Sequence, residues 1–301
     1  MLRFKEITIS SLQEIYPFLL CSQSRTCDFT VGGIYMWIDY FDYRYCIYED
    51  TLFIMGRLED DRRKVAFSVP VGRMPIADSV ALVVEYCRFN GLCPSFSAVP
   101  EEALLPLRTL YPDCSVTELT DWGDYLYSSQ SLATLVGHKY NKKRNRVNKF
   151  LRDYPVYEYR PLCRDDISVV REFFAEKYCS QTVYSEMAQY ENSKVLEVLD
   201  HFEELCRLGF SGGYITVDGN VVAFTIGEVL NDTLYVHIEK ALYDYVGSYE
   251  AINQFYARDC CSRHPEVVYI NREDDAGDAG LREAKLSYNP LTIVRKYDVF
   301  V

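Results

Sequence analysis

The sequence predicts a mixed α+β protein built from two halves, and three observations lead to this prediction. The chain has 301 residues, which leaves room for two domains at about 100–200 residues each. Hydrophobic residues make up 49% and charged residues 25%, the composition of an ordinary globular protein. In each half, the periodicity of apolar residues predicts an ending of strand, helix, strand, helix, strand.

The first half, residues 1–130, has predicted elements that end at turn or capping residues. Ser11 is an N-cap residue type, Glu49-Asp50 separate the strands of a hairpin, and Gly91 follows an amphipathic helix. The predicted strands are 2–8, 43–48, 51–57, 64–70, 95–99, 115–119 and 124–128, and the predicted helices are 11–20, 76–90 and 100–110.

The second half, residues 131–301, begins with the basic segment 138–152 and contains an antiparallel meander. Its predicted strands are 156–161, 212–217, 221–230, 233–242, 267–271 and 292–299, and its predicted helices begin at Asp165 and span 194–208, 248–262 and 278–286. GNAT acyltransferases have this order of elements: a strand, two helices, an antiparallel meander, and then alternating helices and strands. The fold class we expect is therefore a tandem duplicated GNAT (acyl-CoA N-acyltransferase-like) fold, with two mixed sheets flanked by helices.

Composition and charge exclude several classes of protein. The net charge is -12, so the chain as a whole repels phosphate and any polyanion must bind a local basic patch. No stretch approaches the ~20 apolar residues that span a bilayer, and the first residues do not resemble a signal peptide. The 11 cysteines show no zinc-ligand spacing. We expect a cytoplasmic protein without a metal site, with reduced and mostly buried thiols.

The segment 138–152 (HKYNKKRNRVNKFLR) contains seven cations and no anion. On a helix, most of these cations share one face, because residues three and four apart are neighbours. The pattern favours a strip that binds the phosphates of tRNA or of an anionic lipid surface. The alternative is a solvated helix whose cations pair with carboxylates of an acidic protein. The candidate phosphate-binding residues are Lys139, Lys142, Lys143, Arg144, Arg146 and Lys149.

A second candidate site lies on the predicted strand 233–242. Alternation along a strand places His237 and Glu239 on one face, where they are candidates for a general base and its orienting partner. A nucleophile that attacks an acyl ester must lose a proton, which is the reason for a base at this position. The alternative is a structural polar pair on the sheet surface.

A third candidate site follows the buried strand 267–271, because ligands in α/β sheets bind beyond the carboxyl ends of strands. Arg272 is suited to clamp a phosphate or carboxylate, with Glu273 beside it. Lys285 and Tyr288 follow one helix later. The alternative is an acidic loop that caps the helix at Asp278.

The turn Gly247-Ser248 precedes the predicted helix 248–262. In GNAT domains, this turn donates backbone N–H groups to the diphosphate of coenzyme A. Here the turn has a single glycine, with Asp244 and Tyr249 where small residues are expected, which weakens a coenzyme A site. The alternative is an ordinary helix entry.

Three segments carry a resemblance to a known family: LVGHKYNKKRNRVNKF, VHIEKALYDYVGSYEAINQFYA and YINREDDAGDAGLREAKLSYNP. They resemble blocks of an uncharacterised bacterial family related to the C-terminal domain of phosphatidylglycerol lysyltransferases, over residues 120–301. The resemblance implies a tandem GNAT fold shared with the Fem-type aminoacyltransferases of peptidoglycan synthesis. In characterised relatives, an aminoacyl ester on tRNA is passed to a lipid or peptide acceptor.

Carried over to this chain, the resemblance implies that the basic helix faces tRNA or membrane phosphate. It also implies that His237, Glu239, Arg272 and Lys285 line a cleft. These 301 residues hold no multispan membrane region of the kind found in full lysyltransferases, so a soluble acceptor is possible beside a lipid. Fold alone does not fix function.

The leading functional hypothesis is an acyltransferase that moves an aminoacyl group from aminoacyl-tRNA to a lipid, peptide or small-molecule acceptor, with no further cofactor. One alternative is an acyl-CoA-dependent N-acyltransferase with coenzyme A at Gly247-Ser248. Another is a non-catalytic module that binds tRNA or other phosphates. The sequence does not indicate an oligomeric state.

Overall fold

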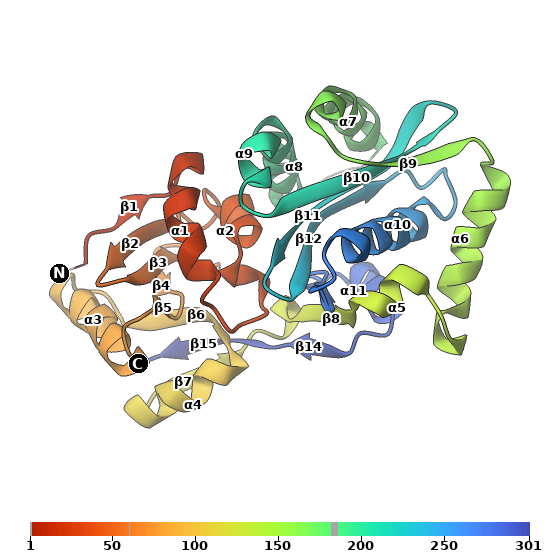
Figure 1. Ribbon diagram of the computed structural model, residues 1–301. Helices are drawn as coiled ribbons and strands as arrows, with labels where there is room; N and C mark the ends of the chain where they lie inside the picture. The colour runs from red at the N-terminus through yellow and green to blue at the C-terminus, as the bar shows by residue number, and fades with distance from the viewer. Residues whose placement is uncertain (1, 60, 182–185) are drawn as a thin grey trace. The chain divides into compact units, whose positions relative to one another are not determined.

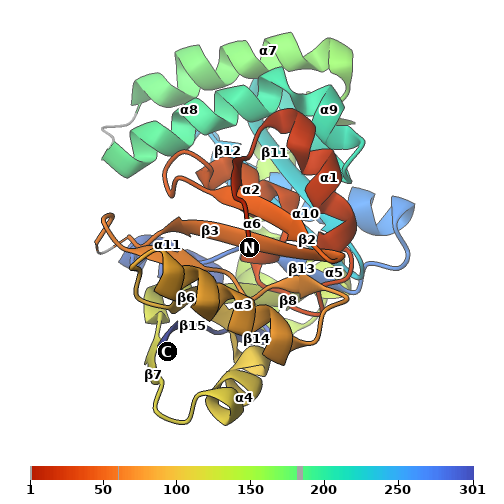
Figure 2. The same cartoon turned by 90° about the vertical axis from the view of Figure 1, so that its left-hand side faces the viewer.

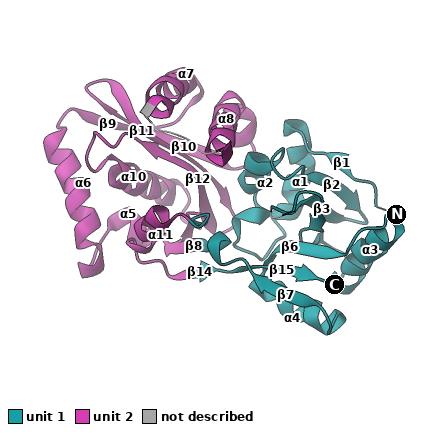
Figure 3. Cartoon of the chain, turned by 180° about the vertical axis from the view of Figure 1, so that it is seen from behind, with its two compact units in different colours: residues 1–124, 274–277, 293–301 teal, residues 125–273, 278–292 magenta. Residues whose placement is uncertain are grey.

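The computed structural model describes residues 2–59, 61–181 and 186–301 (Figure 1). The chain forms two compact units, coloured separately in Figure 3. Unit 1 comprises residues 1–124, 274–277 and 293–301, and unit 2 comprises residues 125–273 and 278–292. Each unit is therefore assembled from more than one segment of the chain.

Unit 1 is built on an eight-stranded mixed sheet with the order β1-β2-β3-β4-β6-β15-β7, in which β5 pairs with β3. The β4–β6 pair is parallel, and β15 lies antiparallel between β6 and β7. The strands are β1 (Lys5–Glu6), β2 (Arg44–Tyr48), β3 (Thr51–Arg57), β4 (Val65–Phe67), β5 (Val71–Gly72), β6 (Ser95–Pro100), β7 (Ser115–Glu118) and β15 (Lys296–Phe300).

The helices of unit 1 are α1 (Leu12–Leu19), α2 (Val31–Trp37), α3 (Ile76–Phe89) and α4 (Glu101–Leu110). Helix α3 forms because Val80, Val83 and Cys87 recur at helical spacing, and all three are buried. They share a core cluster with Phe67 of β4 and Phe96 of β6. The amphipathic face predicted for this helix therefore packs on the sheet.

Unit 2 is built on a seven-stranded mixed sheet with the order β14-β8-β13-β12-β11-β10-β9. The strands are β8 (Asp124–Ser128), β9 (Tyr157–Pro161), β10 (Phe210–Val217), β11 (Asn220–Leu230), β12 (Thr233–Ala241), β13 (Tyr269–Asn271) and β14 (Thr292–Val294). The helices are α5 (Ser129–Thr134), α6 (Asn141–Asp153), α7 (Ile167–Glu172), α8 (Glu186–Asp200), α9 (Phe202–Cys206), α10 (Ser248–Arg263) and α11 (Ala279–Leu286). Helix α7 continues as a π-helical turn, Phe173–Tyr178.

Helices cover both faces of the β10–β12 meander. Helix α10 lies on one face and α7, α8 and α9 lie on the other (Figures 1 and 2). Strands β12 and β13 pair in parallel as far as Tyr235 and Asn271, after which β13 ends and β12 continues. Beyond the end of β13, side chains of β12 and of the segment after β13 lie side by side, as the contact between Glu239 and Arg272 shows.

The prediction of a mixed α+β fold with two mixed sheets and flanking helices is confirmed. The two units divide the chain differently from the predicted halves 1–130 and 131–301. The predicted strand 292–299 is two strands, because β14 pairs in the sheet of unit 2 and β15 pairs in the sheet of unit 1. Strand β8, expected in the first half, pairs with β13 in the second sheet.

Two further differences concern helices and cysteines. The short helices α2 and α5 were not predicted, since each has too few turns to show periodicity. Of the 11 cysteines, only Cys27, Cys46, Cys87 and Cys260 are buried, so the prediction of mostly buried thiols is wrong. Among the described residues, no helix is both long enough and apolar enough to cross a bilayer.

Candidate functional site

A polar cluster in unit 2 lies where β13 ends beside β12. Its centre is the carboxylate of Glu239 on β12. Arg272 follows β13 and donates from Nη2 to Glu239 Oε1 at 2.7 Å. Asn253 of α10 donates from Nδ2 to Glu239 Oε2 at 3.0 Å. The Glu239 carboxylate therefore holds two side chains in place: Arg272, at the end of the adjoining strand, and Asn253, on the helix that covers the sheet.

Two polar atoms of this cluster are buried without a hydrogen-bond partner among the described residues. They are Arg272 Nη1, a donor, and Asn253 Oδ1, an acceptor. Leaving such an atom unsatisfied costs about 1–3 kcal/mol. A ligand that offers one acceptor and one donor recovers this free energy. These two atoms are therefore the points of the cluster at which hydrogen-bonding capacity is unused among the described residues.

The segment that carries Arg272 is held firmly. Its backbone N–H donates to the carbonyl oxygen of Tyr125 at 3.0 Å, and its carbonyl oxygen accepts from Lys285 Nζ at 2.6 Å. The guanidinium carbon lies 4.7 Å from the ring centroid of Tyr288 and 5.9 Å from that of Tyr127. Lys285 therefore positions Arg272 through its backbone, and the substrate-binding role of Lys285 stays a prediction. Tyr288 supports the guanidinium as a neutral ring, because burial raises its pKa well above the usual range.

The basic helix α6 reaches the same cluster through Lys143. Its Nζ lies 4.0 Å from the ring centroid of Tyr288 and 3.5 Å from Glu250 Oε1 on α10. Burial lowers the pKa of Lys143, and the charge of Glu250 partly restores it. One tyrosine ring thus contacts a cation from the basic helix and a cation from the polar cluster. The sequence-based expectation that the basic segment lies beside Arg272 and Glu239 is met at this point.

The other candidate cations of the segment 138–152 divide into two groups. Lys139, in the turn before α6, and Lys142, Arg146 and Lys149, on α6, are exposed. Arg144 is half-buried and donates to the carbonyl oxygen of Leu135 at the end of α5, which gives it a structural role. Its predicted contact with phosphate stays a prediction. Tyr140, Val147 and Phe150 anchor the opposite face of the segment in the core.

Several exposed cations also have carboxylate partners. Arg146 lies 3.6 Å from Glu250, and Lys149 pairs with Asp153. The alternative in which cations pair with carboxylates is thus correct for these residues. The exposed strip nevertheless continues from the paired cations to Lys142, on the same face of α6, and to Lys139 in the turn that precedes the helix.

His237 does not lie beside Glu239, contrary to the predicted pairing. The ladder between β11 and β12 shifts register at Ile226/Gly227, so His237 is an extra residue in the strand and the two-residue alternation is interrupted. Its Nδ1 lies 2.6 Å from Glu273 Oε1 and its Nε2 lies 3.1 Å from Glu228 Oε1. The sequence could not reveal this bulge.

The protonation of His237 argues against a role as general base. Burial alone lowers its pKa, but the hydrogen bonds and charges of Glu228 and Glu273 outweigh burial and raise the pKa to about 10. The ring is then an imidazolium near neutral pH, with both N–H groups donated to carboxylates. Because Glu273 follows Arg272 directly, this buried Glu–His–Glu group instead fixes the segment that carries Arg272.

The Gly247-Ser248 turn is packed rather than open. Gly247 has φ +92°, and a Cβ there would lie 2.4 Å from the carbonyl oxygen of Arg146 and 3.1 Å from Phe150 Cβ. Ser248 is buried and donates its hydroxyl to the carbonyl oxygen of Leu242. The first turn of α10 also contains Glu250, whose charge opposes an anion there. This glycine therefore serves the packing of α6 on α10.

We expect Gly247→Ala to destabilise the protein by about 2–4 kcal/mol, since it combines a left-handed backbone with a steric overlap. Gly219→Ala is a matched control, because Gly219 has φ +80° and open space around its Cβ position. Chemical denaturation should show a loss at least about 1 kcal/mol larger for Gly247→Ala than for the control. Equal losses would show that α6 does not pack on this turn.

Sequence reasoning did not identify Asn253, Glu250 or Tyr127 as site residues. Asn253 and Glu250 lie three residues apart on α10 and are both buried. The sequence did contain a signal for these two residues: they are polar and recur at helical spacing on a helix that was expected to be buried. Tyr127 lies on β8, which was expected in the other half of the molecule.

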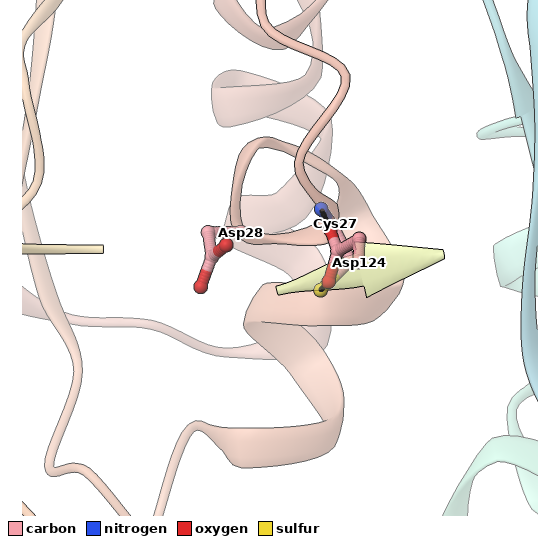
Figure 4. Close-up of side chains that lie close together, drawn as sticks. All are labelled: Cys27, Asp28 and Asp124. Atoms are coloured by element: carbon pink, nitrogen blue, oxygen red, sulfur yellow. Dashed lines mark hydrogen bonds between the residues drawn. The ribbon is translucent and has the colours of Figure 1, made fainter. Parts of the chain in front are cut away.

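Unit 1 contains a different charged cluster, around the ammonium group of Lys296. Its Nζ lies 2.8 Å from both Asp28 and Asp124 and 3.3 Å from Cys27 Sγ. Figure 4 shows Cys27, Asp28 and Asp124 beside the start of β8. The ligand atoms of these three residues lie within 4.8 Å of one another, a spacing that would suit a metal ion. The lysine ammonium, however, already contacts all three, so a buried cation is supplied by the chain itself.

The architecture of unit 2, with a parallel β12–β13 pair joined through α10 and an antiparallel meander before it, defines a GNAT-like domain, and the whole chain has a tandem GNAT, Fem-like fold. The chain belongs to the family described as "Phosphatidylglycerol lysyltransferase, C-terminal", whose model matches residues 21–300. The resemblance inferred from the three sequence blocks is therefore confirmed.

Solved structures agree with this assignment. A conserved protein of unknown function from Bacteroides thetaiotaomicron VPI-5482 is 32% identical, with a TM-score of 0.90 and coverage of 100% of both chains. The C-terminal domain of a putative lysylphosphatidylglycerol synthetase from Agrobacterium fabrum is 13% identical, with a TM-score of 0.69 over 97% of this chain and 92% of that one. FemX is 8% identical, with a TM-score of 0.64 over 99% and 97%. The last two show the fold alone.

One curated relative is the uncharacterized protein MYCGA3080 of Mycoplasmoides gallisepticum. It is 27% identical over 183 residues, which are 59% of this chain and 56% of the relative. The match thus spans little more than half the length of that relative.

Proposed function

We propose that this protein is an acyltransferase that moves an aminoacyl group from aminoacyl-tRNA to an acceptor, with its reaction centre at the Glu239–Arg272–Asn253 cluster. Family membership supports transfer chemistry. The observation that carries the proposal is the Tyr288 ring, which contacts Lys143 of the basic helix and Arg272 of the cluster. A donor whose phosphates lie along α6 would thereby present its end to the polar cluster.

The reaction is the attack of an acceptor amine or hydroxyl on the carbonyl carbon of the aminoacyl ester. A bond from the nucleophile to this carbon forms, the carbon–oxygen bond to ribose breaks, and the nucleophile's proton ends on the ribose oxygen. Arg272 Nη1 would donate to the carbonyl oxygen as negative charge develops there. Asn253 Oδ1 would accept from the α-amino group of the aminoacyl moiety. Because the ester is already activated, positioning and charge stabilisation supply most of the catalysis.

Glu239 has two roles in this proposal. It orients Arg272 and Asn253 through its two oxygens, and its remaining lone pairs would relay the proton from nucleophile to ribose oxygen. His237 is not the base, because its raised pKa keeps both ring nitrogens protonated. The reaction needs no further cofactor, and a tRNA donor would place the protein in the cytoplasm.

The acyl-CoA alternative receives less support from the geometry. The Gly247-Ser248 turn is covered by α6 backbone, and Glu250 places negative charge where a diphosphate would bind. The non-catalytic alternative predicts that Glu239→Gln leaves tRNA binding unchanged and that neither protein transfers an aminoacyl group. Transfer by the wild type, lost in Glu239→Gln, would exclude it.

We expect the charge reversals Lys139→Glu and Lys142→Glu, combined, to weaken tRNA binding and to flatten its salt dependence. Lys142 is exposed on α6 and Lys139 is exposed in the turn before it, so the fold should persist. Each lost phosphate contact should lower the slope of log K against log salt by about 0.7–0.9. Filter binding or fluorescence anisotropy across a salt series measures this slope.

The matched control is Arg88→Glu with Arg108→Glu, which changes net charge equally at exposed positions of α3 and α4. It should leave the slope close to that of the wild type. Identical slopes for both double variants would contradict the role of α6. Anionic vesicles tested in parallel would show whether the strip prefers lipid phosphate to tRNA.

A further inference from the structure

Unit 1 contains a cavity of about 280 Å³ that the proposed reaction does not use. It lies against strands β3, β4, β6, β7 and β15, with α2 and the segment after it on another side. All of its lining residues belong to unit 1. This volume is close to the lower limit of small-molecule pockets. The cavity therefore has the size to hold a compact organic molecule.

Carboxylates outnumber cations around Lys296. Asp28, Asp298 and Lys296 line the cavity, and Asp124 pairs with Lys296 at 2.8 Å. Asp298 shares a face of β15 with Lys296, because the two residues are two apart on one strand. Elsewhere in the lining the charges balance, with Arg57 and Lys64 against Glu59 and Asp61. The group around Lys296 thus has three carboxyl groups for one ammonium group.

Lys296 cannot serve as the binding group for an anionic ligand. Its side chain is 1% exposed, and its ammonium lies 2.8 Å from the carboxylates of Asp28 and Asp124. Both carboxylates would have to give up this partner before a ligand anion could take it. Burial raises the pKa of Asp28, Lys296 lowers it, and Asp124 raises it again. Burial is the largest of these causes, so the pKa of Asp28 rises, and a second cation beside the carboxyl group would favour its charged form.

The walls of the cavity are largely apolar and aromatic. Phe41 stacks on Tyr43 with ring centroids 5.4 Å apart, and its ring lies 6.4 Å from that of Trp122. Phe67 and Phe300 add further rings to the lining. Aromatic faces bind flat apolar groups and also attract cations.

We propose that this cavity binds a small organic amine, whose ammonium group lies beside Asp28 and Asp298 and whose flat apolar body contacts Phe41, Tyr43 and Trp122. The charge excess selects a cation, and the aromatic walls select an organic cation over a hydrated metal ion. The proposal is independent of the reaction proposed for unit 2. It assigns unit 1 a ligand of its own.

The experiment compares three indole compounds of similar size, which differ in the charge of the side-chain end: tryptamine (cation), tryptophol (neutral) and indole-3-propionate (anion). Isothermal titration calorimetry of the full chain at pH 7 measures their affinities. Tryptamine should bind with a Kd below about 1 mM and at least about tenfold more tightly than tryptophol, since a charge-assisted hydrogen bond contributes about 1.5–3 kcal/mol. Indole-3-propionate should bind most weakly.

Two variants test the place of binding. Asp28→Asn should weaken tryptamine at least about tenfold and leave tryptophol nearly unchanged. Thr117→Trp should block all three compounds; Thr117 is an exposed lining residue, so this variant keeps the fold even if Asp28→Asn does not. Asp78→Asn on α3 is the matched control and should bind like the wild type. Equal affinity for amine and alcohol, preference for the carboxylate, binding unaffected by Thr117→Trp, or no binding at all would each overturn the proposal.

Discussion

Arg272→Lys is expected to lower kcat/KM for aminoacyl transfer by about 10²–10³-fold, the loss typical of removing one donor to a developing oxyanion. Lysine keeps the positive charge but lacks the planar fork that donates to Glu239 through Nη2 while Nη1 remains available. The rate should therefore fall even if the charge of the cluster is retained. Steady-state kinetics with aminoacyl-tRNA as donor measure the effect.

The control for this prediction is Arg263→Lys at the end of α10, where the guanidinium pairs with Asp259 and is partly exposed. Its kcat/KM should stay within about threefold of the wild type, the change that corresponds to less than 1 kcal/mol in the barrier. Thermal unfolding of both variants separates loss of structure from loss of rate. Equal activity of Arg272→Lys and wild type would remove Arg272 from the reaction centre.

His237→Gln is expected to destabilise unit 2 by about 3–5 kcal/mol, because it removes the cation from a buried ion pair and leaves two carboxylates facing each other. His237 is almost fully buried between Glu228 and Glu273. Replacing both His237 and Glu228 by Gln removes one charge of each sign and should recover part of the loss. Urea denaturation of the three proteins at pH 7 tests this order.

The pH dependence of stability gives an independent measurement of the same group. The pKa of His237 rises from an ordinary 6.5 to about 10 in the folded protein. The contribution of His237 to the free energy of unfolding is therefore complete below pH 6.5 and is lost as pH rises through about 10. Between these limits, the free energy of unfolding of the wild type should fall as pH rises. The slope of this fall should exceed that of the double variant by about 1.4 kcal/mol per pH unit. Parallel pH profiles would contradict the raised pKa.

The sequence was sufficient to predict most elements of the fold where their patterns were long. Helices α3 and α10 and the meander β10–β12 were found because apolar periodicity and hairpin turns are local signals. Strand partners are not local. Nothing in residues 292–299 distinguishes a strand that ends in one sheet from two strands that pair in different sheets.

The candidate site was predicted in part for the same reason. Arg272 was proposed from its position after a buried strand, Glu239 from alternation along a strand, and Lys143 from the charge of its segment. The bulge at His237 depends on the register of two strands, so alternation gave a wrong partner. Gly247 has the residue type of a phosphate-binding turn, but its conformation serves the packing of α6.

Strand β15 has a consequence for how the protein is made. Residues 296–300 form an inner strand of the first sheet, with partners β6 and β7 on either side. During synthesis, the strands β1–β7 emerge first, yet their sheet lacks β15 until residues 296–300 have been translated and have left the ribosome. The first unit to be translated is therefore the last to close, and an open edge of β6 is exposed to chaperones or aggregation in the meantime.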